Sequence, residues 1–255
     1  MAQPGAGSER MKEWIVGRNP VYEVLKADRR HSFRLLTAKG VEEKGRFLEI
    51  RRLAQKKKLP VTVVPRNQLD GYGENHQGVA LETSVYPYAD LQTIVEKTRQ
   101  SADPIFILAL DIIQNPQNMG TLLRTAEAVG IQGVLIPLAR AVGVTPAVVQ
   151  ASAGASEHLL VAPINLSQGL TQLKEEGAWV IGLEGAPDAT PMDKVDLKGP
   201  VVIVVGSEGE GMRQLTRKSC DVLLKLPMLG QIESLNAAVA GSIVLYQARM
   251  ARKSL

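Results

Sequence analysis

The chain has 255 residues, 45% of them hydrophobic, which is enough for one large or two ordinary domains. Its one cysteine, Cys220, excludes an intramolecular disulfide and a cysteine-rich metal site, and its three histidines show no ligand spacing. No run of about 18 apolar residues occurs, so we expect a soluble, cytoplasmic protein without a structural metal. Residues 1–11 show no signal-peptide pattern and are predicted to form a disordered leader.

The basic residues are concentrated in the first third of the chain. Residues 1–90 carry 16 Lys+Arg against 11 Asp+Glu, and residues 29–58 carry 11 against 3. Such density suggests a polyanion partner such as a nucleic acid, because cationic side chains neutralise phosphates. A solvated helix face is the alternative interpretation. The candidate RNA-binding residues are Arg29, Arg30, Arg51, Arg52, Lys56, Lys57 and Lys58.

The first part of the chain alternates helix and strand patterns on a short period. The predicted elements are a helix at 19–27, a strand at 33–38, a helix at 44–57, a strand at 60–65 and a strand at 79–84. Together they indicate a small domain over residues 12–86. His76 lies in the turn-rich stretch GYGENHQG that precedes the last strand. Residues 87–103, which include a predicted helix at 90–99, are the expected linker.

After Pro104 the strand patterns become continuously apolar, which indicates a parallel sheet covered by helices on both faces. The predicted strands are 106–111, 133–137, 179–184, 201–206 and 222–228, and the predicted helices are 121–129, 146–152, 167–176, 213–219 and a final one within 231–250. Ligands of such sheets bind at the loops that leave the carboxyl ends of the strands. The polar loops 112–120, 207–212 and 226–236 are therefore expected to share one pocket.

The loop SEGEGM at 207–212 does not have the pattern of a phosphate loop. Gly206, Gly209 and Gly211 fail the G-x-G-x-x-G order, and no Walker lysine follows. Glu208 and Glu210 would also repel a phosphate. A ligand with a cationic or neutral face fits better, and a plain glycine-rich turn is the alternative.

The stretch QIESLNAAVAGSIVLYQARM at 231–250 predicts a helix of small apolar residues with polar side chains at its start. Serine and asparagine are common helix N-caps. A cap uses only one side chain, so Ser234 and Asn236 cannot both be explained in this way.

Three motifs follow one another in the second part of the chain. They are N-x-G-x-x-x-R-T-A at 118–126, G-S-E-G-E-G at 206–211, and L-P-M at 226–228 followed by S-L-N at 234–236. In combination they resemble the SpoU class of RNA ribose 2'-O-methyltransferases, also called the TrmH family. One departure is that Ala237, Ala238 and Val239 stand where the family usually has Val-Ser-Val.

The front of the chain resembles the family's small domain. G-R-N-P-V at 17–21 and H-Q-G-V-A at 76–80 are similar to its ribosomal-protein-L30e-like substrate-binding domain. The chain is most similar to the bacterial members that methylate a guanosine ribose in 23S ribosomal RNA.

The resemblance implies an α/β fold with a mostly parallel C-terminal sheet flanked by helices and a deep trefoil knot, the SPOUT fold, over residues 104–255. It also implies a homodimer through the knotted domain and S-adenosylmethionine as cofactor. By carry-over Gly206, Leu226 and Leu235 would bind this cofactor, largely through backbone groups.

The implied reaction moves a methyl group from a sulfonium to a ribose 2'-hydroxyl. Arg124 is the expected central residue, either as an electrostatic clamp on the developing alkoxide, which the stable positive charge of a guanidinium group favours, or as a general base. The structural alternative for Arg124 is an exposed helix arginine paired with Glu127. The structural alternative for Asn118 is an N-cap of the helix that follows. The candidate catalytic residues are Arg124, Asn118, Glu208, Ser234 and Asn236.

Two other functions stay open at this point. The substrate can be transfer RNA instead of ribosomal RNA, and the chain can be a non-catalytic RNA-binding protein with the same fold. The presence of Arg124, Glu208 and Asn236 favours the enzyme.

Overall fold

The computed structural model describes residues 12–252, so the predicted leader at 1–11 lies outside the described residues. The chain divides into two compact units, residues 1–87 and 88–255. The helix α4 (Leu91–Gln100), within the predicted linker, is part of the second unit, and its Ile94 and Val95 are fully buried in the core of that unit.

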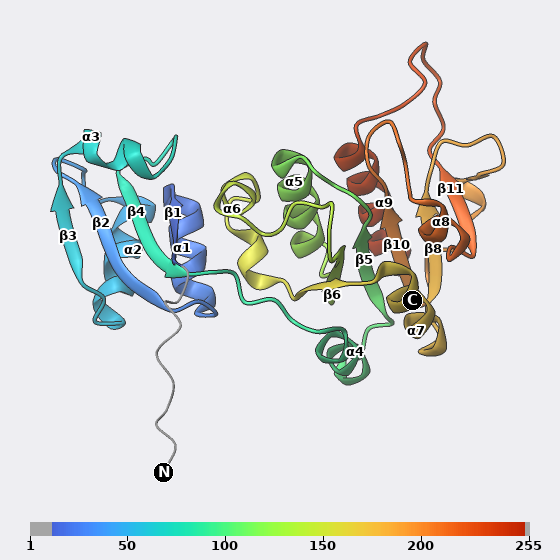
Figure 1. Cartoon of the computed structure of the whole chain (residues 1–255), viewed down its shortest axis with the longest axis horizontal. Coiled ribbons are helices and arrows are strands. Elements are labelled where there is room, and N and C mark those ends of the chain that lie inside the picture. Colours follow the sequence, from blue (N-terminus) through green and yellow to red (C-terminus); the bar gives the residue numbers. More distant parts are fainter. Residues whose placement is uncertain (1–11, 253–255) are drawn as a thin grey trace. The chain divides into compact units, whose positions relative to one another are not determined.

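The first unit is a four-stranded mixed sheet with helices (Figure 1). Its elements are β1 (Lys12–Val16), α1 (Arg18–Ala27), β2 (Ser32–Ala38), α2 (Gly45–Lys56), β3 (Val61–Val64), α3 (Arg66–Leu69) and β4 (Val79–Ser84). The strand order is β1-β4-β2-β3, with β4 antiparallel to both of its neighbours and β2 parallel to β3. Strand β1 was not predicted, because the five residues KEWIV are too short to show a decisive pattern.

His76 fixes the turn that precedes β4. Its Nε2 lies 3.0 Å from Asp70 Oδ1, and its Nδ1 accepts a hydrogen bond from the Gly78 amide at 3.0 Å. The next residue, Gln77, accepts from the amide of Arg18 at 3.0 Å. The two segments that resemble the family's small domain therefore meet at the start of α1.

The second unit is built on a seven-stranded sheet in the order β7-β6-β5-β10-β8-β11-β9, in which every pairing is parallel. Its strands are β5 (Phe106–Leu110), β6 (Gly133–Pro137), β7 (Val161–Ile164), β8 (Trp179–Leu183), β9 (Thr190–Pro191), β10 (Val201–Val205) and β11 (Val222–Lys225). Its helices besides α4 are α5 (Pro116–Ala128), α6 (Pro146–Ala151), α7 (Leu166–Glu175), α8 (Gln214–Lys218) and α9 (Ala237–Arg252). All residues of β5, β6 and β10 are buried, as the continuous apolar runs predicted.

One side of helix α9 packs on α5 and β10. A Cβ atom at Gly241 would lie 2.6 Å from Leu122 Cδ2, so glycine permits this close approach. The hydroxyls of Thr125 and Ser242 lie 2.9 Å apart across the same contact. The small residues of α9 therefore serve helix packing.

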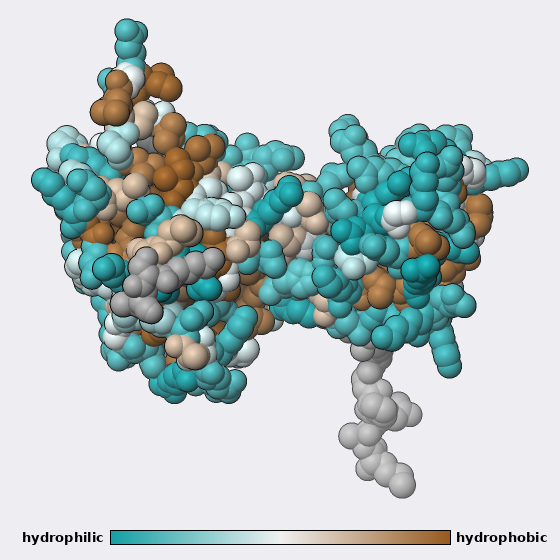
Figure 2. All heavy atoms as spheres, turned by 180° about the vertical axis from the view of Figure 1, so that it is seen from behind, coloured by the Kyte–Doolittle hydropathy of each residue, from teal (hydrophilic) through white to brown (hydrophobic). Residues whose placement is uncertain are grey.

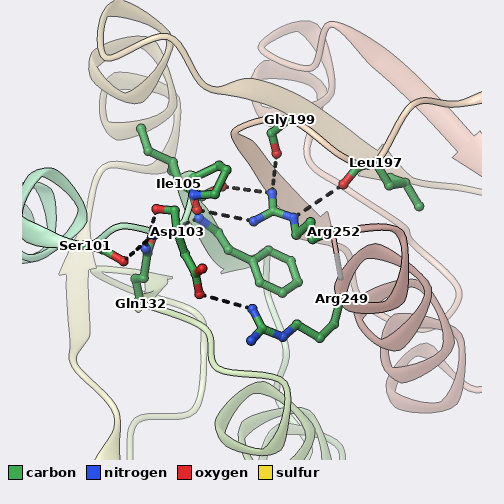
Figure 3. A network of polar contacts seen from close by, with 10 residues as sticks. Ser101, Asp103, Ile105, Gln132, Leu197, Gly199, Arg249 and Arg252 are labelled. Atoms are coloured by element: carbon green, nitrogen blue, oxygen red, sulfur yellow. Dashed lines mark hydrogen bonds and ion pairs between the residues drawn. The ribbon is translucent and has the colours of Figure 1, made fainter. Parts of the chain in front are cut away.

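The end of α9 is fixed at the amino edge of the sheet, as Figure 3 shows. The buried Arg252 guanidinium donates to the backbone carbonyls of Leu197, Pro104, Ile105 and Gly199. It also lies 4.2 Å from the Phe106 ring centroid, and Arg249 pairs with Asp103 at 3.2 Å. Burial lowers the pKa of Arg252 to about 10, so the side chain stays charged at neutral pH. With one end held here, α9 presents its first turn at the opposite, carboxyl edge of the sheet.

Candidate active site

A cavity of about 740 Å³ opens at the carboxyl ends of β8, β10 and β11. It is lined by residues 183–186, the loop 206–211 after β10, and parts of the loop 226–236 and the start of α9. Gly206, Leu226 and Leu235, the predicted cofactor-binding residues, all line it, as does Ser234. The volume is that of an ordinary small-molecule site.

The loop after β10 folds back onto the strand from which it comes. Ser207 and Gly211 exchange two backbone hydrogen bonds of 3.0 and 3.1 Å. A Cβ atom at Gly206 would lie only 2.4 Å from the carbonyl carbon of Gly211, so only glycine fits at the base of the turn. This compact turn leaves Glu208 exposed in the lining of the cavity.

Three polar side chains from three separate segments meet next to the cavity. The Asn118 amide donates to Glu208 Oε1 at 3.1 Å, and the Asn236 amide donates to Asn118 Oδ1 at 3.0 Å. Asn236 also donates to Glu208 Oε1, which accepts the Ala237 amide at 3.3 Å as well. The structure thus brings together three of the five predicted catalytic residues.

Asn236 is both the N-cap of α9 and a member of this cluster. Its Oδ1 accepts hydrogen bonds from the amides of Ala238 at 3.0 Å and Val239 at 3.1 Å, while its side-chain nitrogen faces Asn118 and Glu208. Capping alone therefore does not account for its polar side chain.

Asn118 is not an N-cap, so that alternative was wrong. The cap of α5 is Asn115, whose Oδ1 accepts from the Gln117 amide at 2.8 Å, with Pro116 as the first helical residue. The helix begins five residues earlier than predicted, since the sequence assigned 116–120 to a loop. Asn118 lies in the first turn and is free to bind Glu208.

Sequence reasoning missed Asp111, which fixes the loop after β10 from below. Its fully buried carboxylate accepts from the Arg213 backbone amide at 2.8 Å and from Arg213 Nε at 2.7 Å. The Asp111 amide donates to the Val205 carbonyl at 2.8 Å. Both ends of the loop are thereby tied to β5. An acidic residue at the end of the apolar run FILALD was the signal that could have revealed it.

Arg124 stands apart from the cluster. It is exposed on α5 and does not line the cavity. Within residues 12–252 its side chain makes no hydrogen bond or ion pair, and the alternative pair with Glu127 is not formed.

The cavity lining is acidic. It contains Glu184, Glu208, Glu210 and Glu233 but no lysine, arginine or histidine among the described residues. Arg217 pairs with Glu184 at 3.1 Å from outside the lining. Carboxylates attract a cationic ligand and repel a phosphate. These four glutamates therefore suit a ligand with a sulfonium and an ammonium group.

The candidate RNA-binding residues of the first unit differ in exposure. The Arg30 side chain is fully buried and pairs with Glu13 at 2.7 Å. Arg29 donates to the Pro87 carbonyl at 3.1 Å. Arg51 pairs with Glu43 at 3.5 Å, and Lys57 pairs with Asp28. The exposed members of the set are Arg52, Lys56 and Lys58.

Two family models match the chain. The SpoU rRNA Methylase family matches residues 105–246, and the RNA 2'-O ribose methyltransferase substrate binding domain matches residues 14–89. YacO of Bacillus subtilis, which bears a TrmH family tRNA/rRNA methyltransferase name, is 39% identical over 92% of this chain and 94% of its own length. The 23S rRNA (guanosine-2'-O-)-methyltransferase RlmB of Xylella fastidiosa is 37% identical over 94% and 96%.

Solved structures show the same fold. AviRb from Streptomyces viridochromogenes, in complex with AdoMet, superposes with a TM-score of 0.78 at 20% identity over 96% of this chain and 92% of that one. An AdoMet-bound rRNA methyltransferase from Sinorhizobium meliloti gives 0.76 at 21% identity over 94% and 87%. The predicted fold class, with its parallel-sheet domain and small N-terminal domain, is confirmed.

The two domains and the cavity define an RNA 2'-O-ribose methyltransferase that depends on S-adenosylmethionine. The chain belongs to the SpoU family, to which the TrmH name of its relatives also refers. No helix within residues 12–252 is long and apolar enough to cross a membrane.

Proposed function

We propose that this enzyme, in the cytoplasm, methylates the ribose 2'-hydroxyl of a guanosine in large-subunit ribosomal RNA. The observation that carries the proposal is the Asn118–Glu208–Asn236 cluster beside an acidic cavity, in a chain that is 37% identical to a 23S rRNA guanosine methyltransferase over nearly its whole length. Transfer RNA is the second candidate substrate, since the name of YacO covers both RNA classes.

When bound, S-adenosylmethionine supplies a methyl group on a cationic sulfur. Gly206, Leu226 and Leu235 hold the cofactor, and the glutamates of the lining attract its charge. Asn118 and Asn236 fix the Glu208 carboxylate, and Glu208 with Ser234 orients the ribose hydroxyl. The hydroxyl oxygen would take the methyl group, its proton would pass to solvent, and the cofactor would leave as the neutral thioether S-adenosylhomocysteine. Positioning of this kind contributes about 7 to 11 kcal/mol in favourable cases.

Arg124 acts as the electrostatic clamp for the alkoxide, and a second copy of the chain supplies it. This placement rests on its position outside the cavity lining of its own chain. The outer side of α9 carries a row of half-exposed apolar residues, Val239, Ile243, Tyr246 and Met250, at helical spacing. Figure 2 shows hydrophobic side chains, coloured brown, gathered on the second unit. Such a row is typical of a homodimer interface.

The substrate is tested with labelled S-adenosylmethionine and two RNAs from cells that lack the endogenous enzymes, 23S ribosomal RNA and transfer RNA. We expect label in 23S RNA only, in an alkali-resistant dinucleotide that contains 2'-O-methylguanosine. Label confined to transfer RNA would overturn the ribosomal substrate and keep the chemistry. The absence of label from both RNAs would overturn the proposed activity.

The shared site is tested by mixing two inactive chains, Arg124→Ala and Asn236→Ala. If Arg124 serves the partner's cavity, the mixed dimer has one intact site, and random association restores about a quarter of wild-type activity. Activity that stays at the level of the two parents refutes this arrangement. Light scattering gives the mass in parallel, and Ile243→Glu is expected to halve it.

A further inference from the structure

A second hollow lies at the same edge of the sheet as the cofactor cavity. It measures about 430 Å³ and is lined by the segments that follow β6 and β7 and by the start of α8. Its principal side chains are Leu138, Arg140, Arg213 and Leu215. The mechanism above uses none of them to hold substrate.

The strand order places this hollow beside the cavity. It lies at the ends of β6 and β7, while the cavity lies at the ends of β8, β10 and β11. Neighbouring strands are about 4.8 Å apart, so β6 and β10, with β5 between them, are roughly 10 Å apart. One RNA strand can therefore reach both places.

The two linings carry opposite charge. The cavity has four glutamates and no cation, whereas the hollow has two arginines and no carboxylate among the described residues. The charge of Arg213 is balanced by Asp111. Arg140 is exposed and makes no hydrogen bond or ion pair within residues 12–252, so it is the cation available to a ligand. A phosphate is repelled from the cavity and attracted to the hollow.

The hollow also has exposed apolar side chains. Leu138 is 73% exposed and Leu215 is 69% exposed, although both are large and aliphatic. Arg140, two residues after Leu138, has a backbone φ of +63°, which a residue with a Cβ atom rarely adopts. Unpaired RNA bases pack against apolar side chains as well as aromatic ones, and their phosphates bind cations.

We propose that this hollow binds a nucleotide of the RNA substrate that neighbours the methylated one. Its base packs against Leu138 and Leu215, and its phosphate binds Arg140. The inference rests on the proposed function in that the ligand is the RNA strand whose ribose enters the cavity. It makes the loop 138–140 part of the substrate site.

Binding is measured first, by fluorescence anisotropy with a fluorescein-labelled, single-stranded RNA of mixed sequence. Arg140→Ala is expected to weaken binding about tenfold and to lower the slope of log K against log salt by about 0.7, the share of one phosphate contact in a single strand. Leu138→Ser with Leu215→Ser should weaken binding without changing the slope. The matched control is Lys198→Ala, which removes one exposed charge at the amino edge of the sheet.

Activity is measured next, with 23S ribosomal RNA transcribed in vitro. The variants of the hollow should raise the KM for RNA and leave both kcat and the Kd for S-adenosylmethionine within twofold of wild type. If Arg140→Ala has the same RNA affinity and the same KM for RNA as Lys198→Ala, the inference is overturned, even if the wild type methylates RNA. If the wild type binds the oligonucleotide through Arg140 but methylates no RNA, the proposed function fails, while the proposal that the hollow binds RNA is supported. If wild type does not bind it, the inference fails as well.

Discussion

The two roles of Asn236 can be separated by substitution. Asn236→Ala removes the cap of α9 and the donor to Glu208, whereas Asn236→Asp keeps an acceptor for the amides of Ala238 and Val239 and removes only the donor. An N-cap contributes about 0.5 to 2 kcal/mol to stability, and aspartate caps as well as asparagine does. We therefore expect Asn236→Ala to lower the unfolding free energy by about 1 kcal/mol, and Asn236→Asp to lower it by less.

Activity should respond differently from stability. In Asn236→Asp a second carboxylate faces Glu208 where an amide donated, so like charges repel and Glu208 moves. A displacement of about 1 Å in a catalytic group costs roughly 10²-fold in rate. Both variants are therefore expected to lose about 10²-fold in kcat, although only Asn236→Ala is clearly destabilised.

The assays are denaturant unfolding and single-turnover methyl transfer. Asp90→Ala serves as the control, because Asp90 caps α4 through a 2.7 Å bond from the Thr93 amide and lies outside the cluster. It should lower stability and leave kcat unchanged. Wild-type kcat in Asn236→Asp would refute the role of the cluster. Unchanged stability in Asn236→Ala would refute the role of the cap.

Three further predictions concern the loops and the cysteine. Asp111→Ala frees Arg213 and with it the far end of the loop after β10, so the Kd for S-adenosylmethionine should rise at least tenfold in calorimetry. Gly206→Ala should abolish binding in the same assay, while Gly230→Ala, whose new Cβ meets no atom within 4 Å, should bind normally. Burial raises the pKa of the Cys220 thiol to about 12. Alkylation of the folded protein, followed by mass spectrometry, should therefore stay slow until the pH approaches 12, and a rate that rises near pH 9 would contradict the burial.

Periodicity predicted the sheet of the second unit well where strands are buried on both faces. The apolar runs of β5, β6 and β10 needed no other signal. It missed β7, because VAPI has four residues and contains Pro163. It also missed β1, because the five residues KEWIV are too few to show a decisive pattern. The knot is implied by the family alone, since the order in which a chain threads leaves no periodic signal.

The site was predicted in part for a physical reason. Loops at the carboxyl ends of parallel strands converge, so the motifs around Asn118, Glu208 and Asn236 were expected to meet. Sequence could not show that Asn236 caps α9 with its side-chain oxygen and contacts Asn118 and Glu208 with its side-chain nitrogen, because this depends on the path of the chain into α9. Nor could it separate Arg30, buried against Glu13, from the exposed Lys58, since both belong to one basic stretch.

The apolar residues of α9 are packed on one side of the helix only. Its inner residues Gly241 and Val244 are packed within the unit, while Val239, Ile243, Tyr246 and Met250 remain 41 to 57% exposed. The chain cannot cover this outer row with α5 or β10, because both already occupy the inner side of the helix. Arg124 is the other predicted feature to explain, because its side chain has no partner within residues 12–252. The second copy that we propose would pack on the outer row and take Arg124 into its cavity, so the mixing experiment with Arg124→Ala and Asn236→Ala tests both parts of the proposal together.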